Sequence, residues 1–122
     1  MTPAGGPPPR VLVASEVGLA IRGMDDVLDV ISAAYDADAL ILTAHDVAPA
    51  FFDLRTGLAG ELFQKATQYG VRLALVVPDP AAHGPRWPEL AYEHARHATV
   101  RIVASRTDAD AWLASGTGRH VG

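Results

Sequence analysis

The stretch that decides the fold reads ALILT at residues 39–43, TGLAGELFQKATQY at residues 56–69 and VRLALVV at residues 71–77. The first and last segments are continuous apolar runs of strand length, which are typical of parallel strands covered on both faces. The middle segment predicts a helix, because its apolar side chains recur at helical spacing and Gly70 follows as a stop signal. Those apolar side chains are Leu58, Leu62, Ala66 and Tyr69. Together the three segments predict a parallel β-α-β unit.

The same alternation of strands and helices continues on both sides of this unit. Residues 25–36 predict a helix whose apolar face is formed by Leu28, Ile31 and Tyr35. The C-terminal part adds a helix at residues 87–97, a strand at residues 100–104 and a last helix that is capped by Thr107 and carries Trp112 and Leu113.

The N-terminal part predicts an antiparallel hairpin, with short strands at residues 11–15 and 19–21 joined by a turn. The full order is then β-β-α-β-α-β-α-β-α. It predicts the α/β class and a mixed, mostly parallel sheet in a single domain. We expect this domain to cover residues 10–115, after a disordered proline-rich leader at residues 1–9 and before a flexible tail at residues 116–122.

Composition and charge limit the function classes. The chain has 122 residues, 49% of them hydrophobic, a formal net charge of −4 and no cysteine. Disulfides and thiolate chemistry are therefore excluded, and an acidic surface has no general attraction for nucleic acid or anionic lipid. The longest apolar runs are far shorter than the roughly 20 residues that cross a bilayer. Since the N-terminus has no signal-peptide pattern either, we expect a cytoplasmic protein.

The strongest local signal lies just before the predicted second helix. Asp53 can cap backbone N–H groups there, Arg55 adds a cation, and Thr56 and Gly57 lie where a helix presents unpaired N–H groups to an anion or a partner. The alternative is that Asp53 or Thr56 is a simple helix cap and that Gly57 and Gly60 allow close packing. Under that alternative, we expect Gly60 to contact a neighbouring element.

A second candidate is an acid–base pair. His45 and Asp46 precede the second helix, and Glu61 near its start could point back toward them. A neighbouring carboxylate raises the pKa of a histidine, and a histidine–carboxylate pair can move protons. The alternative for Glu61 is a solvated helix face.

Histidines near the predicted third helix are a weaker candidate. His94 and His97 share a helix face, and His83 precedes them, but no carboxylate is spaced to complete a metal site. Glu93 and Arg96 are most simply a surface ion pair. The chain contains no phosphate-loop, dinucleotide or nucleophile-elbow motif. We therefore expect no metal and no cofactor.

Two resemblances are carried by the same segment. FDLRTGL at residues 52–58 resembles the strand-to-helix corner of the sulfate-transporter and anti-sigma-factor-antagonist (STAS) domain. In antagonists of that class a serine at this corner is phosphorylated by a partner kinase, and Thr56 occupies the matching place. The longer segment FFDLRTGLAGELFQK at residues 51–65 is similar to a family of small bacterial proteins, domain of unknown function 4180. That resemblance extends over residues 11–113 and includes Glu93; it implies the fold but no activity.

Two functions remain open on the sequence alone. The first is a STAS-like binding or regulatory module that contacts a protein or small molecule through Phe51, Phe52, Asp53, Arg55, Thr56, Gly57 and Glu93. The second is a cofactor-independent isomerase or cyclase, with His45 as base, Asp46 or Glu61 orienting it, and a small hydrophobic carbonyl compound as substrate. Among protein partners, a second copy of the chain is an open alternative.

Overall fold

The computed structural model describes residues 10–115, so the predicted leader and tail lie outside the described residues. Four strands and five α-helices form this part of the chain, with short 3₁₀ turns between them. The strands are β1 (Val11–Val13), β2 (Ala39–Thr43), β3 (Arg72–Val76) and β4 (Val100–Val103). The helices are α1 (Met24–Tyr35), α2 (Pro49–Phe52), α3 (Leu58–Tyr69), α4 (Arg86–Glu93) and α5 (Arg106–Ser115).

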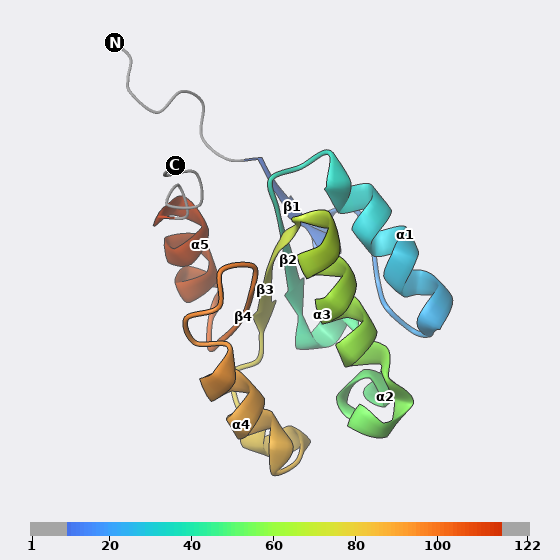
Figure 1. Ribbon diagram of the computed structural model, residues 1–122, viewed down its shortest axis with the longest axis vertical. Coiled ribbons are helices and arrows are strands. Elements are labelled where there is room, and N and C mark those ends of the chain that lie inside the picture. The colour runs from blue at the N-terminus through green and yellow to red at the C-terminus, as the bar shows by residue number, and fades with distance from the viewer. Residues whose placement is uncertain (1–9, 116–122) are drawn as a thin grey trace.

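The sheet is parallel throughout, and its strands lie in chain order, β1-β2-β3-β4. Figure 1 shows α1 and α3 on one side of the sheet and α5 on the other, which makes three layers. Side chains alternate between the layers as a pleated strand requires. Leu40 pairs in register with Leu73 on the α1–α3 side, and Ile41 pairs with Ala74 on the α5 side. The predicted α/β class is confirmed.

The smaller core layer under α5 is centred on Trp112, with Leu113 and Ala109 buried beside it. Two arginines of the sheet stack on the indole: the guanidinium carbons of Arg72 and Arg101 each lie 4.9 Å from its ring centroid. The Arg72 guanidinium also donates hydrogen bonds to the carbonyl oxygens of Trp112 and Leu113. A buried arginine therefore ties the sheet to the end of this helix.

The predicted N-terminal hairpin is wrong. After β1 the chain enters a 3₁₀ turn at Ala14–Glu16, and Ile21 forms only an isolated bridge, parallel to Val47. The Ile21 N–H donates to Asp46 O at 2.9 Å, and Ile21 O accepts from Ala48 N at 2.8 Å. Because these bonds go to the segment after β2, Ile21 has no N–H or C=O left to pair back with β1.

Helix ends and faces also differ from the predictions. In α1 the buried side chains are Val27, Val30, Ile31 and Ala34, whereas Leu28 and Tyr35 are exposed. The third helix was predicted to reach His97, but it ends at Glu93. From there to His97 the chain continues through turns. The last helix is capped by Ser105, whose Oγ accepts from Asp108 N, so Thr107 lies inside it. Within residues 10–115 no helix is long and apolar enough to cross a membrane.

Candidate functional site

The candidate site is the corner between β2 and α3, residues 51–57, at the carboxyl edge of the sheet. Open parallel sheets present their ligands and partners at this edge. Two short helical turns replace the predicted loop: α2, which starts with Pro49 at its first position, and a 3₁₀ turn at Leu54–Thr56. Asp53 separates them in an extended conformation, φ −84° and ψ 102°. The chain thus turns twice within a few residues before α3 begins.

A cluster of four aromatic rings forms the base of this corner. Phe52 stacks on His83 with centroids 3.7 Å apart and planes 14° apart, and both Phe51 and Phe52 pack against Trp87. The indole N–H of Trp87 donates to Phe52 O at 2.8 Å. The cluster joins segments that follow β2 and β3, and Figure 1 shows α2 and α4 together at the lower end of the molecule.

This cluster corrects the role expected for Phe51. Its side chain is 0% exposed, so it belongs to the core and has no surface for a partner. Phe52 is half-buried. The corner therefore rests on a packed aromatic base and not on an open apolar cavity lined by both phenylalanines.

The exposed part of the corner is an ion pair between residues two apart. The Arg55 Nε and Nη2 atoms donate to the two carboxylate oxygens of Asp53, each at 3.0 Å. The Asp53 carboxylate also accepts from Arg55 N at 3.1 Å. These hydrogen bonds lower the pKa of Asp53 and raise the pKa of Arg55. The Arg55 side chain is nevertheless 91% exposed, so the guanidinium is both oriented and accessible.

Thr56 and Gly57 make the junction with α3. The Thr56 hydroxyl lies 2.8 Å from the carbonyl oxygens of both Ala50 and Asp53 and accepts from Leu58 N at 3.3 Å. Gly57 has φ +80°, the left-handed region that favours glycine. The expected capping of the second helix by Asp53 is therefore wrong. Asp53 caps the preceding 3₁₀ turn, and the helix starts two residues later than predicted, at Leu58.

The three candidate acid–base residues are not connected by hydrogen bonds or ion pairs among the described residues. The Asp46 carboxylate is buried and accepts from Thr43 N at 2.8 Å and from Thr43 Oγ1 at 3.0 Å. Glu61 pairs with Lys65 along α3 at 3.6 Å. His45 is exposed, and within residues 10–115 no hydrogen bond joins its ring to either carboxylate. The Asp46 carboxylate thus holds the backbone and side chain of Thr43 at the end of β2.

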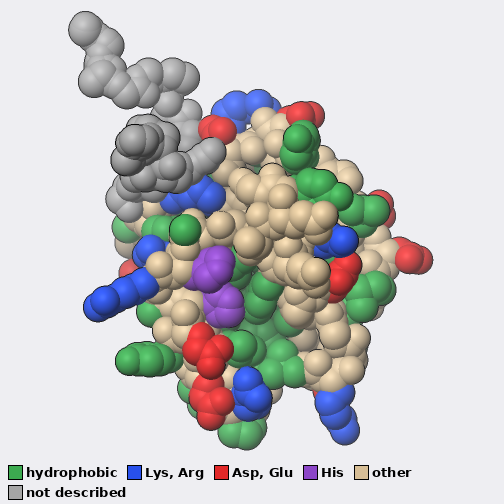
Figure 2. All heavy atoms as spheres, in the orientation of Figure 1, with side chains coloured by type: hydrophobic (Ala, Val, Ile, Leu, Met, Phe, Trp, Pro, Cys, Tyr) green, Lys and Arg blue, Asp and Glu red, His purple; other side chains and the backbone are tan. Residues whose placement is uncertain are grey.

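His94 and His97 have separate structural roles. His94 Nδ1 lies 2.9 Å from Leu90 O, and His97 Nδ1 accepts from Thr99 N at 3.1 Å and Val100 N at 3.0 Å. Their rings are 5.2 Å apart, and Figure 2 shows histidine side chains gathered near the middle of one face. In the described part of the chain no group of three potential ligands could hold a metal ion.

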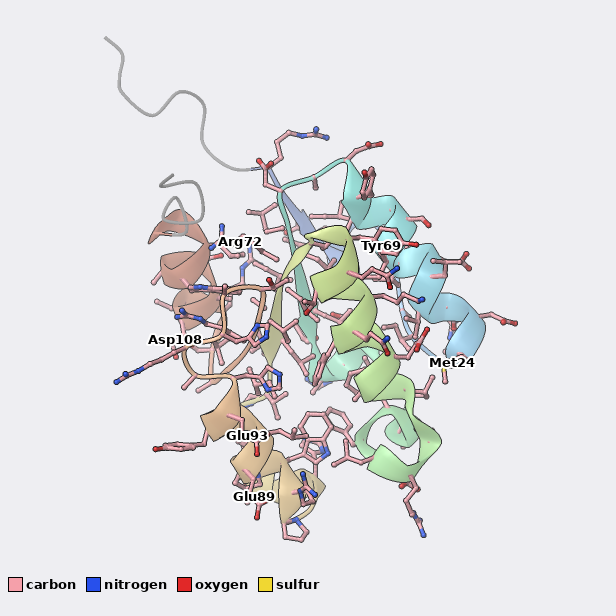
Figure 3. The ribbon with its side chains drawn as sticks, viewed as in Figure 1. Met24, Tyr69, Arg72, Glu89, Glu93 and Asp108 are labelled. Carbon is pink, nitrogen blue, oxygen red and sulfur yellow. The ribbon has the colours of Figure 1, made fainter. Side chains whose placement is uncertain are left out.

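Glu93 does not join the corner. It is the last residue of α4, at the opposite end from Trp87, and its side chain is exposed (Figure 3). Among the described residues, the ion pair of this helix joins Arg86 to Glu89 at 3.0 Å, so the predicted pairing of Glu93 with Arg96 is wrong. Sequence reasoning missed His83 and Trp87 as members of the corner. Their positions in the sequence could have indicated this, because both residues follow β3 and the carboxyl end of β3 lies beside that of β2.

The fold and the corner define a small α/β domain with a sequential parallel sheet and an aromatic-filled carboxyl edge. A family described as a domain of unknown function (DUF4180) matches residues 8–113, and the chain belongs to this family. The predicted family resemblance is thereby confirmed. No curated protein and no solved structure gives a significant match to the chain.

Proposed function

We propose that the chain is a binding or regulatory module that contacts a protein partner through the corner at residues 52–57. The observation that carries the proposal is the exposed Asp53–Arg55 pair. A bidentate pair fixes the direction of a long side chain, so less conformational entropy is lost when a partner binds it. An arginine that is 91% exposed and already oriented is a suitable anchor for a partner carboxylate or backbone carbonyl.

The surroundings of the pair support this proposal. The Thr56 hydroxyl bonds to Ala50 and Asp53 tie the end of the corner to its beginning. Beneath them, the Trp87–Phe52 hydrogen bond holds the aromatic base against α4. A surface supported in this way changes little on binding, as in many pre-organised interfaces.

A STAS-like regulatory role and a cytoplasmic location belong to the same proposal. The STAS comparison rests on the corner sequence, because the sheet is parallel and has no N-terminal hairpin. Phosphate on Thr56 would replace the hydroxyl proton that can be donated to Ala50 O or Asp53 O with a dianion beside Asp53, and it would also offer a new acceptor to Arg55. Modification would therefore change both the shape and the charge of the contact surface.

The acid–base enzyme is the weaker candidate. A general base needs a partner that orients it, and Asp46 and Glu61 are bonded to Thr43 and Lys65 instead of His45. Phe51, Phe52 and Trp87 are packed against each other in the aromatic base, as in a filled core.

The test compares two arginines that are each paired to a nearby carboxylate. The tagged full chain is cross-linked in the cells that produce it, and its cross-linked partners are identified by mass spectrometry for the unaltered chain, Arg55→Glu and Arg86→Glu. Arg86 pairs with Glu89 on α4 at 3.0 Å and is the matched control. We expect a discrete partner that Arg55→Glu loses and Arg86→Glu keeps. Retention of every partner by Arg55→Glu, or equal loss in both variants, would refute the proposal.

A further inference from the structure

Helix α1 carries two apolar faces, and only one of them is buried. Val27, Val30, Ile31 and Ala34 pack into the core. A second row of apolar side chains follows the same helix at spacings that keep it on one side, and it remains at the surface. Its members are Met24, Leu28 and Tyr35, with exposed fractions of 48%, 52% and 61%.

Leu28 and Tyr35 of the exposed row form one wall of a groove shared with α3. Tyr69 of α3 meets Tyr35 edge to face, with ring centroids 6.2 Å apart and planes at 88°. Together with Leu28, Ile31 and Ser32 these rings line a cavity of about 250 Å³ that opens to solvent. Figure 3 shows Met24 and Tyr69 at opposite ends of the α1–α3 pair, so Met24 lies at the other end of the helices from Tyr69 and is not part of the cavity lining.

A row of carboxylates runs beside the apolar row. Asp25, Asp29 and Asp36 are exposed, and none of them forms an ion pair within residues 10–115. Asp25 and Asp29 follow Met24 and Leu28 by one residue, which places them about 100° further round the helix. Asp36 follows Tyr35 as the C-cap of the helix, and its carbonyl oxygen accepts from Arg10 Nη1 at 2.7 Å. The nearest cation on the α3 wall, Lys65, is already paired with Glu61. Figure 2 shows green and red side chains together along the border where α1 lies in Figure 1.

We propose that this groove, lined by Leu28, Ile31, Ser32, Tyr35 and Tyr69, binds a basic amphipathic segment of another protein. An amphipathic helix places its apolar face in such a groove, and lysines or arginines along its flank would meet the unpaired aspartates. A second copy of the chain fits less well, because a symmetric contact through α1 brings two aspartate rows together. The proposal concerns a different surface from the corner and does not depend on it.

The test uses two synthetic helical peptides as probes. Both have leucine along one face; one has lysine along its flanks and the other has glutamate at the same positions. Binding of each labelled peptide to the full chain is measured by fluorescence anisotropy. Leu28→Asp is the disrupting variant, and Tyr92→Asp is its control, since Tyr92 is 85% exposed on α4. Ser32→Trp, which fills the groove from an exposed position, is a second disrupting variant whose fold is checked by circular dichroism.

We expect the lysine peptide to bind the unaltered chain and Tyr92→Asp equally, and to bind Leu28→Asp and Ser32→Trp about tenfold more weakly. Combined replacement of Asp25, Asp29 and Asp36 by asparagine should weaken binding and reduce its dependence on salt. Equal affinity for the glutamate peptide, or undiminished binding by folded Leu28→Asp and Ser32→Trp, would overturn the proposal. A dimer in analytical ultracentrifugation that Leu28→Asp dissociates would overturn it too, because the occupant would then be a second copy.

Discussion

The indole N–H of Trp87 donates a hydrogen bond of 2.8 Å to the backbone carbonyl of Phe52. The two residues belong to α4 and α2, which follow different strands of the sheet. A single side chain thus fixes the position of the corner relative to the helix beside it. Trp87 is only 1% exposed and Phe52 is half-buried, so the bond lies at the edge of the core.

Removing the Trp87 donor should destabilise the fold. Trp87→Phe leaves the Phe52 carbonyl without this partner and shrinks a packed ring, so we expect the free energy of unfolding to fall by about 1–3 kcal/mol. Urea unfolding followed by circular dichroism measures the change. Tyr92→Phe on the same helix is the control and should stay within about 0.5 kcal/mol. An unchanged midpoint for Trp87→Phe would show that the bond contributes nothing to stability.

Gly57→Ala should destabilise the fold through backbone strain, and not through the crowding that the close-packing alternative implies. Gly57 has φ +80°, which costs a residue with a Cβ about 1–2 kcal/mol. A Cβ there would lie 3.9 Å from Met24 Cε, an ordinary contact, so strain is the reason for the loss. Chemical denaturation should rank Gly57→Asn between glycine and alanine, since asparagine tolerates this conformation better. Alanine and asparagine variants of equal stability would refute the explanation.

Gly60→Ala should have the opposite effect. The expectation from the sequence was that Gly60 contacts a neighbouring element, but a Cβ at this position would meet nothing within 4 Å. Alanine restricts the unfolded chain and favours the helix, so we expect a gain of about 0.4–1 kcal/mol. Thermal and urea unfolding of the single variant both test this. A loss of stability would mean that the helix surface at Gly60 is covered.

Stability should decrease in mild acid because of His97. Burial lowers the pKa of its imidazole below the ordinary 6.5, and nearby His94 and Arg101 lower it further. The unfolded chain then takes up the proton first, so the stabilising contribution is complete above pH 6.5 and is lost as the pH falls toward the folded pKa. Protonated Nδ1 could not accept from Thr99 N and Val100 N.

The measurement for His97 is urea unfolding over a series of pH values. His97→Asn keeps an acceptor near the same place but does not titrate in this range, so its stability should change less between neutral and mildly acidic pH. His45→Asn removes an exposed histidine and is the control, which should follow the unaltered chain. A steep loss in acid that His97→Asn retains in full would assign the effect to another group.

Secondary structure was predicted best where the pattern of apolar residues fitted only one kind of element and only one face of it. The ALILT run became β2 with the predicted bounds, and Leu58, Leu62 and Ala66 are buried on α3 as their spacing indicated. Gly70 ends that helix with φ +70°. Helix α1 was harder, because its apolar residues fit two adjoining faces and only packing against α3 selects the one with Val27 and Val30.

The candidate site was predicted as a segment but not as an arrangement. The sequence placed the corner residues before and at the start of a helix, but the Asp53–Arg55 pair depends on a 3₁₀ turn that ends in the left-handed Gly57. The spacing of polar and apolar residues in this segment does not predict such a turn. The burial of Phe51 also depends on Trp87, a residue brought in from beyond the next strand. The burial of Phe51 therefore depends on a contact between residues far apart in the sequence, whereas the Asp53–Arg55 pair depends on the conformation of a local turn.

The strand order β1-β2-β3-β4 has a consequence for how the chain folds. Each of the four strands pairs only with the strands that precede or follow it in the sequence. No strand is therefore inserted between two strands that come earlier in the chain. Loop closure then costs little more for the last strand than for the first. The β2–α3–β3 unit can serve as a nucleus onto which the outer strands add one at a time from either side. The topology therefore allows the sheet to grow by adding strands at its edges, without separating strands that are already paired.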